Sequence, residues 1–250
     1  MTNRAIYDFT GTTVLITGGT SGIGHATAVG FRDAGAQVTV TGTRPSPGDY
    51  DVDLSGIAYH QVILGEGGDA DRLAGAFPAL DVLINNAGAN FPGGRDEATA
   101  EGFTASVQLN LLGPARLTLA LHPALKVSRA NGGASVLMLG SMAALRAVTL
   151  VPGYGSAKAG VLALTRTLAM RWARDRIRVN AVVPGVIDTP MSGDDRRRRA
   201  EEPTAAPHPD APDGHRGGGR LGAGLPVHRK RLLHHGFDAD RRRRIRPVLT

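Results

Sequence analysis

The 250-residue chain contains no cysteine, only three lysines and a single tryptophan. Thiolate nucleophiles, disulfides and zinc–thiolate sites all need cysteine, so the sequence excludes them and favours a reducing compartment. No apolar run approaches the 18 or so residues of a membrane-spanning helix, and the first 13 residues have no signal-peptide core. We therefore expect a cytoplasmic protein with no membrane partner and no metal site.

The positive charge is concentrated at one end of the chain. Residues 1–191 carry 15 Lys+Arg against 14 Asp+Glu, whereas residues 192–250 carry 14 against 8. The last 59 residues also lack tyrosine and tryptophan and show no sustained apolar period of 2 or 3.6. We therefore predict two different regions, a body of residues 1–191 and a tail of residues 192–250.

The body alternates short β-branched runs with helix-like segments. The runs predict strands at residues 13–17, 37–41, 81–85, 134–139 and 178–183. Between them, the composition predicts helices at residues 22–34, 69–77, 97–126 in two pieces, and 154–174. Strands that alternate with crossover helices predict an α/β fold with a doubly wound parallel sheet, which binds ligands beyond the carboxyl ends of its strands.

A glycine-rich turn, TGGTSGIG (residues 17–24), lies between a predicted strand and a predicted helix. Such a turn lets the backbone approach a pyrophosphate, and the helix N-terminus offers free N–H groups. The second strand ends in TGTR (41–44), which has no acid to bind ribose hydroxyls. Arg44 could bind a 2′-phosphate instead, or it could be a solvated loop residue. We expect NADP(H) to be preferred, with NAD(H) as the alternative.

A second candidate site combines a phenol with an ammonium group. Tyr154 and Lys158 are four residues apart and share one helix face. The pKa of a free tyrosine is about 10, and a nearby ammonium would lower it towards neutrality. Ser141 follows a predicted strand and could donate a hydrogen bond to a substrate carbonyl. Two surface residues on an amphipathic helix are the alternative interpretation of the pair.

Residues 10–191 resemble the short-chain dehydrogenase/reductase family, in its single-domain branch with TGxxxGxG and YxxxK motifs. The matching segments, in order, are TGGTSGIG (17–24), NNAG (85–88), Asn110 in VQLNLLG, Ser141, Tyr154 with Lys158, and PGVIDTPM (184–191). The resemblance implies that 1–191 is a dinucleotide-binding catalytic domain with a Rossmann-like fold. It also implies an NAD(P)(H)-dependent oxidoreductase, such as a carbonyl reductase, that moves a hydride between nicotinamide and a ketone or secondary alcohol.

The resemblance also assigns roles to individual residues. Tyr154 would be the acid/base, Lys158 would lower its pKa and hold the ribose, Ser141 would steady the oxyanion, and Asn110 would hold a relay water. The cofactor contacts it implies are Gly18, Thr20, Ser21, Gly22, Ile23, Gly24, Arg44, Asn86, Ala87, Gly88, Tyr154, Lys158, Pro184, Gly185, Ile187 and Thr189. The family's adenine-contacting aspartate is replaced by Leu64 or Glu66.

The pocket candidates are apolar and favour a small apolar ketone or alcohol as substrate. They are Phe91, Leu145, Val148 and Val186, although a core or ordinary lining position is the favoured interpretation for each of them. Arg146 could contact an acidic substrate, but we expect it on the surface.

The resemblance ends at the tail. The family continues with two helices, a last strand and an ending close to VTGxxLxVDGG, and none of these is visible in residues 192–250. One interpretation is an Arg-rich arm that binds nucleic acid, which would suit a nucleotide-sensing or catalytically impaired protein. The other is a frameshifted reading of the gene, which we favour, so we do not expect a nucleic acid partner.

Codon arithmetic supports the frameshift. An arginine codon CGN followed by C becomes GNC one base later, which encodes Val, Ala, Asp or Gly. Residues 228–245 (HRKRLLHHGFDADRRRRI) then permit TGSASFTTGSTLTVDGGY, the ending that the family would have. We therefore expect the last strand and closing helices to be replaced by an irregular, poorly ordered tail. An in-frame chain would be expected to form a homodimer or homotetramer, as the family does.

Overall fold

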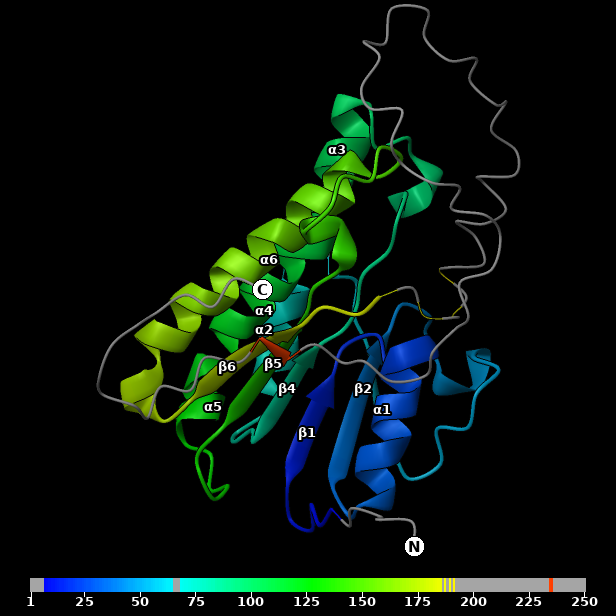
Figure 1. Ribbon diagram of the computed structural model, residues 1–250. Coiled ribbons are helices and arrows are strands. Elements are labelled where there is room, and N and C mark those ends of the chain that lie inside the picture. The colour runs from blue at the N-terminus through cyan, green and yellow to red at the C-terminus, as the bar shows by residue number, and fades with distance from the viewer. Residues whose placement is uncertain are drawn as a thin grey trace, which may run out of the picture.

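The computed structural model describes residues 7–64, 68–185, 187, 189 and 191, together with the backbone of residues 234–235. Its sheet has the strand order β3-β2-β1-β4-β5-β6-β7 (Figure 1). The six parallel strands are β1 (Thr13–Ile16), β2 (Gln37–Gly42), β3 (Ala58–Gln61), β4 (Val82–Asn85), β5 (Ser135–Leu139) and β6 (Arg178–Val182). The α/β prediction of a doubly wound parallel sheet is confirmed.

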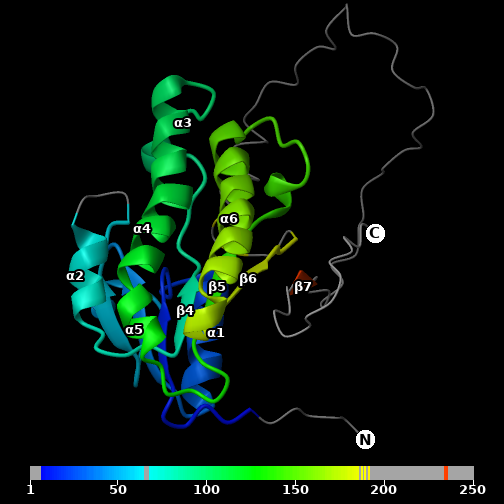
Figure 2. The ribbon, with the colours of Figure 1, turned by 90° about the vertical axis from the view of Figure 1, so that its left-hand side faces the viewer.

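Most of the helices cover one face of this sheet. They are α2 (Asp69–Gly75), α3 (Ala100–Val107), α4 (Gly113–Ala120), α5 (His122–Lys126) and α6 (Pro152–Arg171). The π-helical turn Gln108–Leu112 joins α3 to α4. In Figures 1 and 2, α3 and the first half of α6 project beyond the strand ends. Among the described residues, the α-helix that covers the opposite face is α1 (Gly22–Asp33).

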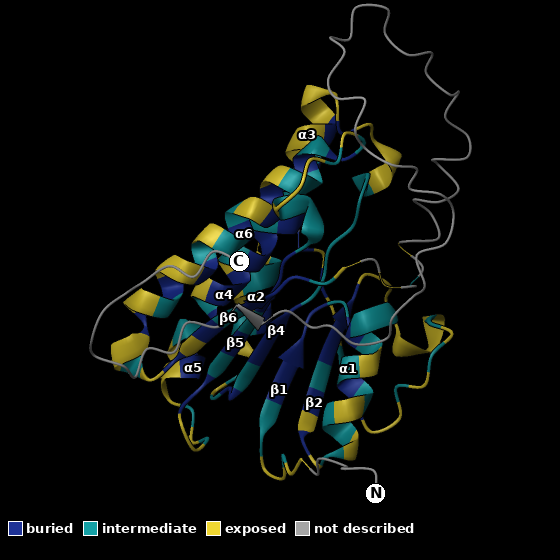
Figure 3. Cartoon of the chain, in the orientation of Figure 1, coloured by how far each residue is buried: buried dark blue, intermediate teal, exposed yellow. Residues whose placement is uncertain are grey.

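The core lies on both sides of the central strands, where the buried residues gather in Figure 3. Successive strand residues point to opposite faces, so Leu15 packs in the cluster under α4 and α6 while Val14 and Ile16 pack in the cluster under α1. All three are fully buried. Each such side chain stabilises the fold by about 1.5–3 kcal/mol relative to an exposed one. This packing fixes the strand ends that carry the site.

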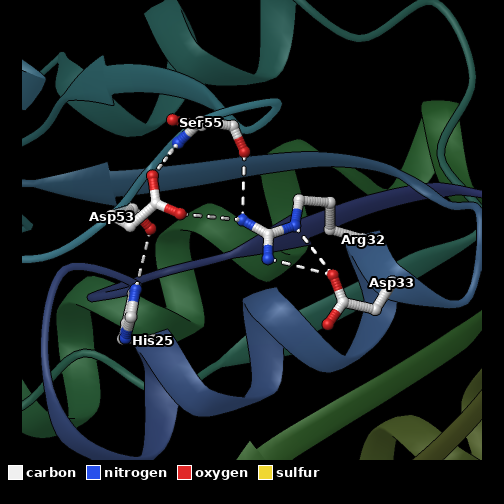
Figure 4. Close-up of polar contacts among 5 residues, drawn as sticks. All are labelled: His25, Arg32, Asp33, Asp53 and Ser55. Carbon is white, nitrogen blue, oxygen red and sulfur yellow. Dashed lines mark hydrogen bonds and ion pairs between the residues drawn. The ribbon is translucent and has the colours of Figure 1, made fainter.

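The loop between β2 and β3 (residues 43–57) is attached to α1 by side-chain contacts (Figure 4). Arg32 of α1 donates to the Ser55 carbonyl oxygen at 3.0 Å and lies 3.7 Å from the Asp53 carboxylate. His25 of α1 is 3.0 Å from the Asp53 carbonyl oxygen. Exposed ion pairs of this kind contribute little to stability, but the contacts of His25 in the first turn and Arg32 in the last turn hold the loop along α1.

At the other edge of the sheet, β7 (His234–His235) pairs antiparallel with Ala181 and Val182 of β6. The remaining expectations for the tail, namely its disorder, its basic arm and its displaced reading frame, lie outside the described residues.

Candidate active site

A cavity of about 370 Å³ opens at the carboxyl ends of the parallel strands. Its walls come from the segments that follow β1, β2, β3, β4, β5 and β6, and from the first two turns of α6. The strand order reverses direction between β1 and β4. Doubly wound sheets bind their ligands at such a switch point, so the cavity lies where the fold places a ligand site.

The glycine-rich turn forms one wall of the cavity and has no space for side chains at two of its glycines. Gly18 has φ +64°, and a Cβ there would lie 2.9 Å from the Ala87 Cα. A Cβ on Gly24 would lie 2.2 Å from the Gly18 carbonyl oxygen. Of the residues predicted in this turn, those lining the cavity are Gly18, Thr20, Ser21, Gly22 and Ile23, whereas Gly24 is packed behind them.

The N-terminus of α1 faces this wall. Ser21 is its N-cap and makes no side-chain capping bond, and the first turn contains no acidic residue. The N–H groups of a first helical turn have no partner within the helix, and the helix dipole adds positive potential there. The local charge therefore suits an anionic group such as a phosphate.

The NNAG segment fixes the shape of the turn by hydrogen bonds. The Asn86 side-chain amide donates to the carbonyl oxygens of Thr17 and Gly18 at 3.0 and 2.9 Å. The Thr17 hydroxyl accepts the N–H groups of Asn86 and Ala87, each at 3.0 Å. Asn86, Ala87 and Gly88 all line the cavity.

The end of β2 forms the far side of the cavity, where Thr41, Gly42 and Thr43 contribute to its lining. Arg44 is not part of that lining. Its guanidinium donates to the Asp49 carbonyl oxygen and lies 5.0 Å from the centre of the Tyr50 ring, so the side chain folds over its own loop.

The segment after β3 lines the cavity with Val62 and Leu64. Leu64, one of the two residues considered for the position of the family's adenine-contacting acid, therefore lies at the cavity wall. Glu66, the other residue considered for that position, lies outside the described residues.

Tyr154 and Lys158 lie side by side on α6 and both line the cavity. The Lys158 Nζ atom is 5.5 Å from the centre of the Tyr154 ring and donates to the Leu139 carbonyl oxygen at 2.8 Å. The side chain of Lys158 is buried, with 4% relative exposure. Burial disfavours the charged amine and lowers the pKa of Lys158 to about 8.

Asn110 is fully buried at the centre of the π-helical turn and is not part of the cavity lining. Its amide donates to the carbonyl oxygens of Ala89 and Ser106, and its Oδ1 accepts the Ala89 N–H at 3.1 Å. A Cβ on Gly88 would lie 2.7 Å from Asn110 Oδ1 and 3.4 Å from Lys158 Nζ. Asn110, Gly88 and Lys158 therefore meet at one point behind the cavity wall.

Ser141 begins a short turn that packs against the start of α6. Its hydroxyl accepts the Ala143 N–H at 3.1 Å and caps the 3₁₀ turn Met142–Ala144. A Cβ on Gly155 would lie 3.1 Å from the Ala143 carbonyl oxygen, which shows how closely this turn approaches α6. Gly140 lines the cavity, while Ser141 follows it and is not part of the lining.

The segment after β6 contributes Pro184, Thr189 and Met191 to the lining. Gly185 and Ile187, which were predicted to contact the cofactor, are outside the lining, and Ile187 is 45% exposed.

The apolar residues that we considered for the substrate pocket do not gather at this cavity. Phe91, Leu145 and Val148 are not part of its lining, and Leu145 is 57% exposed. Arg146 is exposed, as expected for a surface residue. Val186 lies outside the described residues.

The cavity lining also contains residues that the sequence did not indicate, among them Leu109 and Leu139. A further omission is Glu97, whose carboxylate accepts the backbone N–H of Tyr154 at 2.6 Å. An acidic residue inside a predicted helical stretch carries no sign of burial in the sequence. Only its distance of 13 residues from Asn110, itself predicted as a site residue, could have drawn attention to it.

Within residues 7–64, 68–185, 187, 189 and 191, none of the helices is long and apolar enough to span a membrane. The same residues contain no group of three or more His, Asp or Glu side chains arranged to hold a metal ion.

The fold agrees with comparisons to known proteins. The family model for short chain dehydrogenases matches residues 69–200. A tropinone reductase homolog from Datura stramonium is 34% identical over 199 residues, covering 72% of this chain and 70% of the relative. Levodione reductase from Leifsonia aquatica is 34% identical over 204 residues, covering 73% and 72%.

A solved structure of an RhlG/NADP active-site complex from Pseudomonas aeruginosa superimposes with a TM-score of 0.66. It is 29% identical in sequence, and the match covers 79% of each chain. Together with the sheet order and the cavity, these matches lead to one conclusion: the chain belongs to the short chain dehydrogenase family of oxidoreductases.

Proposed function

We propose that this protein is an NADP(H)-dependent oxidoreductase that interconverts a small apolar ketone and its secondary alcohol, with Tyr154 as the acid/base. The observation that carries the proposal is the placement of Tyr154 and Lys158 in the same cavity as the glycine-rich turn. The family membership supports the reaction type, since its matched relatives include a tropinone reductase homolog and a levodione reductase.

The residues that line the cavity fit a dinucleotide. Gly18 and Gly24 leave no room for a Cβ, so the backbone of the turn stays open to a pyrophosphate. The first turn of α1 supplies N–H groups and has no acidic side chain to repel a phosphate. Thr20, Ser21 and Ile23 would hold the phosphates and their ribose, and Pro184 and Thr189 would border the nicotinamide. When bound, the nicotinamide would supply or accept the hydride.

The proton would be moved by Tyr154. In reduction its phenol donates to the oxygen of the substrate carbonyl, and in oxidation its phenolate takes the proton from the alcohol. The Lys158 ammonium nearby favours the phenolate and so lowers the pKa of Tyr154. Because the pKa of Lys158 is about 8, most of its amine is protonated at pH 7. Lys158 would also donate to the nicotinamide ribose.

Ser141 and Asn110 would support this chemistry from opposite sides. The Ser141 hydroxyl would turn from the Ala143 N–H, which it accepts at 3.1 Å, to donate to the developing oxyanion. Asn110 would keep the Ala89 backbone in place and hold a water that links Lys158 to solvent. Its four hydrogen bonds to Ala89 and Ser106 already fix the orientation of its amide.

The preference for NADP(H) over NAD(H) rests on the end of β2. Thr41, Gly42 and Thr43 line the cavity and offer no carboxylate for the ribose hydroxyls. Arg44 follows this end of β2, although its guanidinium donates to the Asp49 carbonyl oxygen and lies over the Tyr50 ring, outside the cavity lining. To bind a 2′-phosphate, this guanidinium would leave these partners and turn towards the cavity, where its planar group could form two parallel hydrogen bonds to the phosphate.

The test is the oxidation of NADPH and of NADH against a panel of apolar ketones. We expect turnover with NADPH to exceed turnover with NADH. The Tyr154→Phe variant should lose about 10²–10⁴-fold in kcat, because it lacks the group that transfers the proton. Tyr7→Phe is the matched control, since Tyr7 is 69% exposed and should leave kcat unchanged. Parental turnover by Tyr154→Phe would contradict the proposed acid/base role.

A further inference from the structure

Glu97 is a carboxylate that the fold buries completely, with 0% relative exposure. It lies in the segment just before α3, far along the chain from α6. Its Oε1 accepts the Phe91 N–H at 3.0 Å, and its Oε2 accepts the Tyr154 N–H at 2.6 Å. A buried carboxylate is expensive unless it is well hydrogen-bonded, so its presence beside the candidate catalytic tyrosine needs a physical reason.

The start of α6 provides part of that reason. Tyr154 is the third residue of α6, so its N–H is one of the donors that a helix leaves without an internal partner. The N-cap residue, Val151, supplies no side-chain cap. Glu97 takes over this role from 57 residues away and places a negative charge at the positive end of the helix dipole.

The second reason for an acid at this buried position is that both of its partners, the backbone N–H groups of Phe91 and Tyr154, are hydrogen-bond donors. A carboxylate can accept one N–H on each oxygen, which is what Glu97 does with Phe91 and Tyr154. A glutamine in the same place has a single carbonyl oxygen, and its NH₂ group would face the other N–H. The pair of contacts therefore requires an acid, and not merely a polar side chain of this length.

The neighbouring backbone is packed to hold Glu97 where it is. A Cβ on Gly102 would lie 1.9 Å from the Asp96 carbonyl oxygen, so α3 presses directly on the segment that carries Glu97. Thr99 caps α3 by accepting the Gly102 N–H at 3.1 Å. A Cβ on Gly153 would lie 3.1 Å from Glu97 Oε2, so a glycine before Tyr154 lets the carboxylate reach the helix.

We propose that Glu97 is a positioning residue for Tyr154, which it holds in register with the wall of the cofactor cavity. The proposal rests on the proposed function, in which Tyr154 transfers the proton. Glu97 joins the first turn of α6 to the backbone at Phe91, two residues beyond Ala89, which lines the cavity and is held by Asn110. A single side chain thus ties the acid/base helix to the loop that faces the substrate.

The experiment compares the full chain with its Glu97→Gln variant, which keeps the shape of the side chain and removes one acceptor. We expect kcat for ketone reduction to fall about 10–100-fold, since a misplacement of about 1 Å can cost about 10²-fold in rate. The KM for the ketone and the Kd for NADPH, measured by fluorescence titration, should stay within about twofold of the parent, because a group that acts only in the transition state lowers kcat and kcat/KM together.

Asp81→Asn is the matched control. Asp81 is also a buried carboxylate with two donors, the Thr13 N–H at 2.9 Å and the Ser128 hydroxyl at 2.6 Å, but it lies at the opposite end of the sheet. This variant should lower the melting temperature without changing kcat. If Glu97→Gln is not obtained folded, Glu97→Asp serves instead, because it keeps the charge and shortens the reach by one methylene group.

The outcomes separate the two proposals. A parental kcat in the Glu97 variant, beside an inactive Tyr154→Phe, would overturn the positioning role alone. A fall in kcat would also overturn it if the KM for the ketone and the Kd for NADPH rose by a similar factor. That pattern would indicate a general loosening of the cavity. Turnover that survives in Tyr154→Phe would overturn the proposed function, and the positioning role with it.

Discussion

At the scale of the residue, the buried amine of Lys158 lowers the stability of the fold in order to place a charge at the site. Its side chain is buried with 4% relative exposure, and its amine donates a hydrogen bond to the Leu139 carbonyl oxygen. No carboxylate in the described residues forms an ion pair with it. A buried cation without a counter-charge lowers the stability of the folded chain, and it is retained where the charge serves a function.

The pH dependence of stability should reveal this loss of stability. The pKa of Lys158 is about 8 in the folded chain, against 10.5 as the ordinary value. Between these values the unfolded chain binds the extra proton, so the free energy of unfolding rises with pH. The gain between pH 8 and pH 10.5 should be about 3 kcal/mol at most. Urea unfolding of the parent and of Lys158→Met at several pH values measures it.

In this comparison the Lys158→Met variant is the reference, because it has no amine to titrate. The stability of the parent relative to this variant should increase as the pH rises from 8 to 10.5. A difference that stays constant across this range, or that falls, would show that the amine is not buried as described.

At the scale of the element, the turn between β1 and α1 depends on the absence of side chains at Gly24. A Cβ at this position would lie 2.2 Å from the Gly18 carbonyl oxygen and 2.4 Å from the Asn86 side-chain amide. Gly24→Ala should therefore lower the free energy of unfolding by about 1–3 kcal/mol through overpacking, and it should weaken NADPH binding because the turn must shift.

Gly30→Ala tests the same substitution within the same helix. A Cβ on Gly30 meets no atom within 4 Å, so alanine should raise the stability by about 0.5–1 kcal/mol and leave NADPH affinity unchanged. Thermal unfolding and NADPH titration of both variants provide the comparison. Equal effects of the two substitutions would contradict the packing described for the glycine turn.

Most elements could be predicted from the sequence because their patterns were strong. The strands β1, β2, β4, β5 and β6 are β-branched or apolar runs, and each was predicted to within about one residue at either end. The third strand, AYHQ at the edge of the sheet, has no such run and was not located. The hydrogen bonds of β3 to β2 define it as a strand, and the pattern of side chains along the sequence does not reveal such pairing.

Helix boundaries were less well predicted. The sequence suggested that α6 begins at Tyr154, whereas it begins at Pro152, a residue suited to the first helical position. The stretch at residues 97–126 was expected in two pieces, but a π-helical turn and an extra break divide it further. Within the π-helical turn, Asn110 bonds to the Ala89 carbonyl oxygen, a contact 21 residues away that the local sequence does not reveal.

The site itself was predicted in part, for a similar reason. The glycine turn, the NNAG segment and the Tyr154–Lys158 pair could be located because each depends on a fixed local spacing. The burial of Glu97 and the folding of Arg44 over Tyr50 depend on contacts between distant or irregular segments. No periodicity in the chain indicates either of them.

At the scale of the whole molecule, the two faces of the sheet are covered unequally. The larger apolar cluster lies under α2, α4, α5 and α6, while in the described residues the opposite face is covered by α1. We propose that residues 1–191 are the catalytic domain and that the tail, residues 192–250, is read in a shifted frame. An in-frame chain would supply the family's closing helices and last strand, and with them a surface for a homodimer or homotetramer.

Sequencing the gene and correcting the frame tests this proposal. The in-frame version should melt more than about 5 °C higher than the present chain, since each kcal/mol is worth about 2–4 °C in a domain of this size. It should also turn over ketones faster, because a closed substrate side excludes water. Equal melting temperatures and turnover in the two versions would contradict it.

The most direct test of the whole account is the pKa of the Tyr154 hydroxyl with NADP⁺ bound. The chain has four tyrosines, so the tyrosinate absorbance of the parent minus that of Tyr154→Phe isolates this one. We predict a transition well below pH 10, and its shift towards 10 or above in Lys158→Met, where the ammonium is absent. A Tyr154 that titrates at pH 10 or above in the parent would contradict the claim that Lys158 prepares it for proton transfer.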